Sequence, residues 1–86
     1  MGVDIYRAKY EYVFGHITEE QFNFINDIIY RSDDGTYELD YEHFQKLKQR
    51  KERYEKTYRT DLGTVFQAFE SEIKKGKGHF SFRVFA

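Results

Sequence analysis

The last residues of the chain carry the sequence feature that most restricts its fold. In residues 79–86 (HFSFRVFA), apolar and polar positions alternate, so that Phe80, Phe82 and Val84 share one face. An alternation with a period of two is typical of a β-strand that buries one face. Because a single strand cannot satisfy its own backbone hydrogen bonds, the chain has to supply a second strand beside it.

The beginning of the chain is the best candidate for that second strand. Residues 3–12 are rich in tyrosine and valine, which favour extended backbone, and we predict a strand there. Asp4 is also a suitable N-cap, and Gly15 a suitable C-terminal stop, for a helix over residues 4–14. The first interpretation predicts a small sheet built from residues 3–12 and 79–85, and the alternative predicts an all-α protein.

Helices are expected between the two terminal strands. Thr18 and Gln21 have the spacing of a capping box, and the apolar residues that follow recur at helical spacing. These features predict a helix over about residues 19–31. Asp40 is a suitable N-cap for a second helix, which we place over about residues 41–59.

A third helix is predicted over about residues 61–75, ending at Gly76. The apolar phase of residues 41–75 is continuous, so the pattern alone does not separate the second helix from the third. An unbroken helix of that length would span about 52 Å, which suits a compact monomer poorly. We therefore expect a break near residues 60–63. Without that break, the surplus apolar seam would predict a homodimer.

The length of the chain limits it to one domain. A domain of 86 residues buries a marginal core, and no proline-rich or repetitive segment divides it. The fold class expected is thus α+β, with three helices packed on a small sheet in a single domain over residues 1–86. No run of about 18 apolar residues is present to span a membrane, and charged residues near the start argue against a secretory signal. A soluble, cytoplasmic protein is expected.

The sequence offers no catalytic or metal-binding pattern. It has no cysteine, and its three histidines form no HExxH motif. The acidic segment around Gly35 does not fit an EF-hand, because Tyr30 and Tyr41 would occupy positions that need carboxylates. No glycine-rich phosphate-binding motif and no GxSxG motif occurs. We therefore expect no enzymatic activity, no cofactor and no metal site.

Charge is unevenly distributed along the chain, although the net charge is only −1. Residues 1–40 contain nine acids and three bases, whereas residues 41–60 contain seven bases and three acids. Net charge informs the choice of partner rather than the fold. The candidate partner-binding acidic surface consists of Glu19, Asp27, Asp33, Asp34 and Glu38.

A basic stripe is predicted on the helix over residues 41–59. Its members fall on successive turns and are candidates for contacts with a protein or with nucleic acid: Lys46, Arg50, Arg53 and Lys56. A solvated helix face is the ordinary alternative. Lys51 instead falls within the apolar stripe, where we expect it to extend past the core edge or to pair with an acid from residues 1–40.

Aromatic residues are too numerous for the core of so small a domain. The chain has nine phenylalanines and eight tyrosines, and each ring buries about 150–250 Å² when it is enclosed. Tyrosine is enriched at protein interfaces, so some of these rings are candidates for a binding surface. The interface candidates are Tyr30 and Tyr37.

These features predict a small non-enzymatic protein-binding module that occludes a surface on a larger protein or on a protein–nucleic acid complex. In size and composition the chain resembles phage-encoded accessory proteins, including inhibitors of host defence complexes, which would place it in the host cytoplasm. An acidic surface that mimics phosphates is a variant of this hypothesis. The alternative is a nucleic-acid-binding protein that uses the basic helix over residues 41–59. Neither hypothesis involves a membrane.

Overall fold

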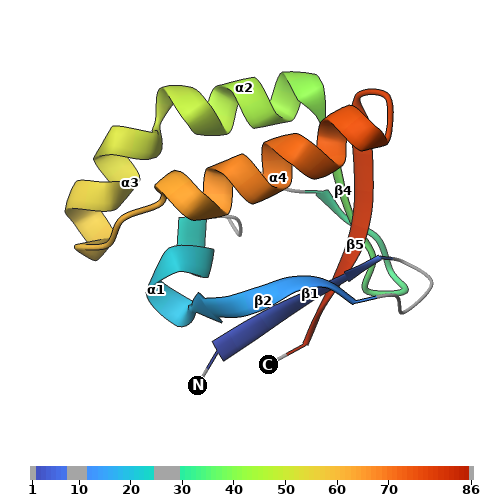
Figure 1. The fold of residues 1–86 in the computed structure, drawn as a ribbon, viewed down its shortest axis with the longest axis horizontal. Helices are drawn as coiled ribbons and strands as arrows, with labels where there is room; N and C mark the ends of the chain where they lie inside the picture. The colour runs from blue at the N-terminus through green and yellow to red at the C-terminus, as the bar shows by residue number, and fades with distance from the viewer. Residues whose placement is uncertain (1, 8–11, 25–29, 86) are drawn as a thin grey trace.

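The protein is a mixed α+β domain with a five-stranded antiparallel sheet, as the computed structural model shows (Figure 1). The structure describes residues 2–7, 12–24 and 30–85. The strand order is β2-β1-β5-β4-β3. The strands are β1 (Gly2–Arg7), β2 (Tyr12–Thr18), β3 (Tyr30–Arg31), β4 (Tyr37–Asp40) and β5 (His79–Phe85).

Three of the helices form a layer above one face of the sheet (Figure 1). In chain order the helices are α1 (Glu19–Phe22), α2 (Tyr41–Gln49), α3 (Lys51–Tyr58) and α4 (Gly63–Lys75). Helix α4 packs against β5 and helix α2 against β4, whereas the short α1 follows directly on β2. The expected α+β class is thus confirmed.

The pairing of the two chain ends is also confirmed, and it places β5 in the middle of the sheet. Strand β5 pairs with β1 on one side, where Ile5 lies opposite Val84, and with β4 on the other, where Leu39 lies opposite Phe80. The all-α alternative is wrong, because β1 and β2 are both extended. The single strand predicted over residues 3–12 is instead two strands that pair with each other, and residues 8–11 lie outside the described part of the chain.

The predicted helix over residues 19–31 begins correctly, but its last two residues are in a strand. The capping box is present: the Gln21 amide donates to Thr18 Oγ1 at 3.1 Å, and Gln21 Oε1 accepts from the Thr18 amide at 3.0 Å. Helix α1 covers Glu19–Phe22, residues 25–29 of the predicted helix lie outside the described part of the chain, and Tyr30 and Arg31 form β3, so the predicted C-terminal boundary is wrong. The strand has a non-local cause, because Arg31 pairs with Tyr37 across the Ser32–Gly35 turn, and no helical spacing encodes that pairing.

Two breaks divide residues 41–75. Helix α2 starts at the predicted cap, where the His43 amide donates to Asp40 Oδ1 at 2.7 Å, and it bends at Arg50. That bend was not predicted, and the expected helix over residues 41–59 is therefore two helices. The break predicted near residues 60–63 is confirmed, since α3 ends at a left-handed Arg59 and α4 begins at Gly63. The condition for the predicted homodimer, an unbroken helix, is not met.

The core lies between the sheet and the helical layer. Phe82 is completely buried, and its ring centroid lies 5.3 Å from that of Phe69 on α4. Phe80 is also buried against Phe69, and Val84 packs on the same cluster, as the alternating pattern predicts. Buried side chains of the helices, such as Phe44, Tyr54 and Phe66, complete the core. The surface of the helical layer that faces away from the sheet is exposed to solvent.

Candidate functional site

The cationic side chains of the described residues fall into two groups. One group pairs with carboxylates at nitrogen–oxygen distances of 2.8–3.6 Å. These pairs are Arg7–Glu72, Lys48–Glu70, Lys51–Glu55, Lys74–Glu70, Lys75–Glu72 and Arg83–Asp34. The other group includes the whole predicted basic stripe, whose side chains make no ion pair or hydrogen bond within the part of the chain that the structure describes.

This second group forms an exposed basic face on α2 and α3, which we define as Lys46, Arg50, Arg53 and Lys56. Both helices turn their apolar side toward the core, with Phe44, Leu47 and Tyr54 buried. The remaining sides of the helices face solvent, and all four members of the basic face are exposed, Arg50 at the bend between the two helices. The carboxylates Glu42 and Glu52 are exposed on the same two helices, so the surface carries both signs of charge.

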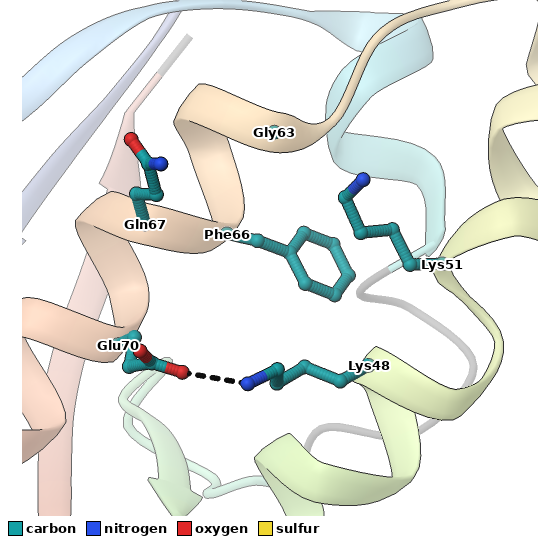
Figure 2. A pocket seen from close by; sticks show the side chains of 6 residues that line it. All are labelled: Lys48, Lys51, Gly63, Phe66, Gln67 and Glu70. Atoms are coloured by element: carbon teal, nitrogen blue, oxygen red, sulfur yellow. Dashed lines mark hydrogen bonds and ion pairs between the residues drawn. The ribbon is translucent and has the colours of Figure 1, made fainter.

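A groove of about 240 Å³ lies between the α2–α3 pair and α4 (Figure 2). Figure 2 shows the Phe66 ring projecting from α4 toward Lys48 and Lys51 on the facing helices. Gly63, at the start of α4, lines the groove without adding a side chain to it. The lysines on the other side come from either side of the bend at Arg50, Lys48 from α2 and Lys51 from α3. The residues that line the groove are Lys48, Lys51, Gly63, Phe66, Gln67 and Glu70.

The lysines around the groove are paired with carboxylates. Glu70 is shared between Lys48 Nζ at 2.9 Å and Lys74 Nζ at 3.5 Å. The hydrogen bond from Lys48 is the main cause that lowers the pKa of Glu70 below its usual value, so this carboxylate stays ionised. Lys51 Nζ lies 3.3 Å from Glu55 Oε2, which also accepts the Leu62 amide at 2.8 Å. A third carboxylate, Asp61, accepts the Gly63 amide at 2.8 Å, so three lysines and three carboxylates surround the groove.

The sequence singled out Lys51 as a cation within an apolar stripe, and the structure places it in the lining of this groove. Of the two expectations for Lys51, a pair with an acid from residues 1–40 is wrong, because its carboxylate partner is Glu55 one turn along the same helix. Its partly exposed side chain agrees with the other expectation, that it extends past the edge of the core. The other lining residues, Phe66, Gln67 and Glu70, have no comparable sequence signal, since the groove exists only when α4 packs beside α2 and α3.

The predicted acidic surface is not brought together by the fold. Glu19 begins α1 directly after β2, whereas Asp33 and Asp34 lie in the turn between β3 and β4. Strands β2 and β3 are the opposite edges of the sheet, so these carboxylates are separated by its width. Asp27 lies outside the described residues. Glu38, on β4, accepts a hydrogen bond from Ser81 Oγ at 2.8 Å and contacts the His79 ring.

Asp34 is tied into the β3–β4 turn by several contacts. Its carboxylate accepts the Ser32 hydroxyl, and it also accepts the Thr36 amide at 3.0 Å. Arg83 Nη1 donates to the Asp34 carbonyl oxygen at 2.8 Å. The Ser32 hydrogen bond is the largest cause that lowers the pKa of Asp34 to about 2. The contacts of this carboxylate are those of a turn-stabilising group.

Of the two predicted interface aromatics, Tyr37 is partly buried, whereas the side chain of Tyr30 lies outside what the structure describes. The Tyr37 ring stacks on Phe82 with centroids 5.3 Å apart, so it packs at the edge of the core. Tyr30 supplies backbone pairing in β3, opposite Glu38. The large apolar side chains that the structure exposes are Tyr12, at 51%, and Tyr41, at 50%.

The described residues contain no group of three or more His, Asp or Glu side chains that is arranged to hold a metal ion. None of the helices described here is long and apolar enough to cross a membrane. No protein-family model matches the chain, and neither a search of curated proteins nor a search of solved structures finds a match.

Proposed function

We propose that this protein is a small non-enzymatic binding module that docks its basic face on an acidic surface of a larger protein and so occludes that surface. The observation that carries this proposal is the division of the cations. Most of the other lysines and arginines in the described structure pair with carboxylates, whereas the four cations of the basic face make no such pair and lie together on two consecutive helices. Arg31, Arg59 and Lys77 are also exposed without a carboxylate partner among the described residues, but they lie separately, in β3, after α3 and in the turn after α4. Charge complementarity of this kind accelerates encounter and selects the partner.

Several features favour a protein over nucleic acid as that partner. Glu42 and Glu52 are exposed on the same helices as the basic face, and a mixed surface suits a partner that also carries both signs of charge. The whole chain has a net charge of −1, so carboxylates elsewhere on the molecule would repel a polyanion. Occlusion needs only a complementary surface, and it requires no catalytic group.

The proposal extends to the kind of protein that acts in this way. Small phage-encoded inhibitors that block a host complex by covering one of its surfaces would have this size and composition. In that role the protein would work in the host cytoplasm. The partner would be a protein or a protein–nucleic acid complex with an acidic contact surface.

Direct binding of nucleic acid is the second candidate function, and the same stripe favours it. Lys46 on α2, Arg50 at the bend and Arg53 on α3 are close in sequence and all exposed, which suits contacts with neighbouring phosphates. Titration of duplex DNA and of RNA at about 50 mM salt tests this candidate directly. If duplex DNA binds, the slope of the logarithm of the binding constant against the logarithm of the salt concentration should become smaller in magnitude by about 0.9 for each phosphate contact that a mutation removes. Absence of binding at low salt would eliminate this candidate.

The protein-docking proposal is tested by affinity capture with two matched charge-reversal variants. In one variant Lys46, Arg50 and Arg53 are changed to Glu. In the control Arg31, Arg59 and Lys77, which are exposed outside the basic face and the groove, are changed to Glu, which alters the net charge equally. We expect wild type and the control to retain the same protein at low salt, and the basic-face variant to lose it.

Nuclease treatment separates the two candidates in the same experiment. A retained protein that survives nuclease but dissociates in high salt supports docking on an acidic protein surface. Loss of the captured protein on nuclease treatment would favour the nucleic-acid candidate. Equal retention by the basic-face variant and by wild type would overturn both candidates.

A further inference from the structure

We infer that the groove between the α2–α3 pair and α4 receives one apolar side chain from an acidic segment of the protein partner. This inference rests on the proposed function and specifies the partner's chemistry. The groove and the basic face lie on the same two helices, so an acidic segment that crosses α2 and α3 meets both. The groove supplies the apolar contact that the basic face lacks.

The size and floor of the groove suit a single side chain. Its volume is about 240 Å³, below the range of about 300–1,000 Å³ that is usual for small-molecule sites. Phe66 is a buried core residue, and the small part of its ring that lines the groove is the aromatic surface on which an apolar side chain can pack (Figure 2). Interface hot spots are often apolar side chains of one partner that fill such a depression on the other.

The charge beside the groove favours a side chain that belongs to an acidic segment. Around the groove itself, Lys48, Lys51 and Lys74 are balanced by Glu55, Glu70 and Asp61, the last of which accepts the Gly63 amide at 2.8 Å. The basic face adds four exposed cations on the same helices, with no carboxylate of the described residues paired to them. These cations would repel a basic segment, whereas a segment with carboxylates beside its apolar residue would neutralise them.

Three small molecules test the combination of ring and carboxylate. Isotope-labelled protein is titrated separately with indole-3-acetate, with 3-methylindole and with acetate, and the backbone amide shifts are recorded. We expect indole-3-acetate to shift the amides of Gly63 and Gln67 at lower concentration than either of the other two molecules. If acetate shifts the same amides at the same concentration as indole-3-acetate, the groove binds only the carboxylate and not the ring, and the inference is overturned.

Two glutamine variants locate the binding. Gln67 lines the groove, whereas Gln49 is exposed at the end of α2 and does not line it. Gln67→Trp places a ring over the groove and should weaken indole-3-acetate binding at least about tenfold. Gln49→Trp should leave that binding unchanged. Gln67→Leu provides the same comparison if the tryptophan destabilises the fold.

A synthetic acidic amphipathic helix with one tryptophan tests the source of the side chain. It should bind more tightly than indole-3-acetate, shift amides in the groove and along α2 and α3, and lose at least about tenfold when its tryptophan is replaced by alanine. Indole-3-acetate binding without peptide binding would assign the groove to a small molecule and would overturn the partner assignment. Captured protein that depends on the basic face but is unaffected by Gln67→Trp would leave the proposed function standing and refute the groove.

Discussion

Gly76 marks the position where α4 ends and the chain turns back into β5. A Cβ atom at this residue would overlap the carbonyl oxygen of His79. That oxygen cannot move away easily, because His79 is paired with Asp40 in the sheet. The requirement for glycine here is therefore one of close backbone approach, since the φ angle of −88° is open to any residue.

Gly76→Ala is expected to destabilise the protein by about 1–3 kcal/mol, because helix end and strand must separate to admit the methyl group. Gly63→Ala is the matched control. A Cβ at Gly63 would meet only Asp61 Oδ1, at 3.2 Å, in the first turn of α4, where alanine is the better helix former. Urea unfolding of both variants measures the difference. Similar losses in the two variants would contradict the crowding argument.

Asp34 provides a pH-dependent contribution to stability. Its pKa is lowered from 3.8 to about 2 in the folded protein by the Ser32 hydroxyl and the Thr36 amide. A carboxylate with a depressed folded pKa stabilises the folded state above its unfolded pKa, and that contribution is lost as pH falls through the folded value. The stabilisation by Asp34 should thus be complete above about pH 4 and disappear toward about pH 2.

Thermal unfolding across that pH range checks the prediction with Asp34→Asn. The variant should melt below wild type near neutral pH, and the two curves should converge as the pH falls toward about 2. Asp33→Asn is the control, since Asp33 is exposed in the same turn and makes none of the Ser32, Thr36 or Arg83 contacts. A constant difference between Asp34→Asn and wild type at every pH would show that the titration of this carboxyl is not responsible.

The two faces of strand β5 contribute differently to stability. Phe80 and Phe82 face the helical layer and are buried. Ser81 lies between them on the other face, where its hydroxyl donates to Glu38 at 2.8 Å. The inner residues contribute burial to stability, and the outer ones contribute polar cross-strand contacts.

Substitutions at neighbouring positions of β5 should differ sharply in cost. Phe82→Ala removes a completely buried ring and should cost about 3–5 kcal/mol. Ser81→Ala removes one partly buried hydrogen bond and should cost about 1 kcal/mol or less. Chemical denaturation of the two variants gives the comparison. Comparable losses would mean that β5 does not bury the face assigned to it.

The edges of the sheet show how the elements limit association. Edge strand β3 has only two residues, and edge strand β2 has two register shifts against β1. Short strands and bulges are features by which natural sheets avoid pairing with other chains. Binding through the helical layer rather than through a sheet edge is consistent with this arrangement.

At the scale of the whole molecule, the fold depends on the strand that comes last in the chain. Strand β5 separates the β1–β2 pair from the β3–β4 pair, and neither pair contacts the other through a ladder. Isolated two-stranded units are marginally stable in water. The domain should therefore not form before its C-terminal strand is available.

Deletion of residues 79–86 should leave the chain unfolded, because both pairs lose their shared neighbour and the core loses Phe80 and Phe82. Circular dichroism and the dispersion of amide proton signals measure the outcome. Deletion of Ala86 alone is the control, since it leaves every residue of β5 in place. A cooperative melting transition in the longer deletion would show that the remaining strands form a core without β5.

The sequence by itself determined the features that depend on neighbouring residues. The capping box of Thr18 and Gln21, the Asp40 cap and the alternation of β5 each rely on side chains within a few positions of one another. Their hydrogen bonds and faces follow from local geometry, so they are readable before the chain folds. The exposure of the basic face was predictable from the same local pattern, since helical spacing places its members beside the apolar stripe and not within it.

Only the tertiary structure decided strand β3, the bend at Arg50 and the groove. Tyr30 and Arg31, the last residues of the predicted helix, are instead in a strand because they pair with β4, and the helical periodicity of the sequence does not encode that pairing. The groove and its charge depend on contacts between distant positions, such as Lys48 with Glu70, and these form only when α4 packs beside α2. Local spacing carries no information about which distant carboxylate neutralises a lysine, so the separation of paired cations from free ones is a property of the folded molecule.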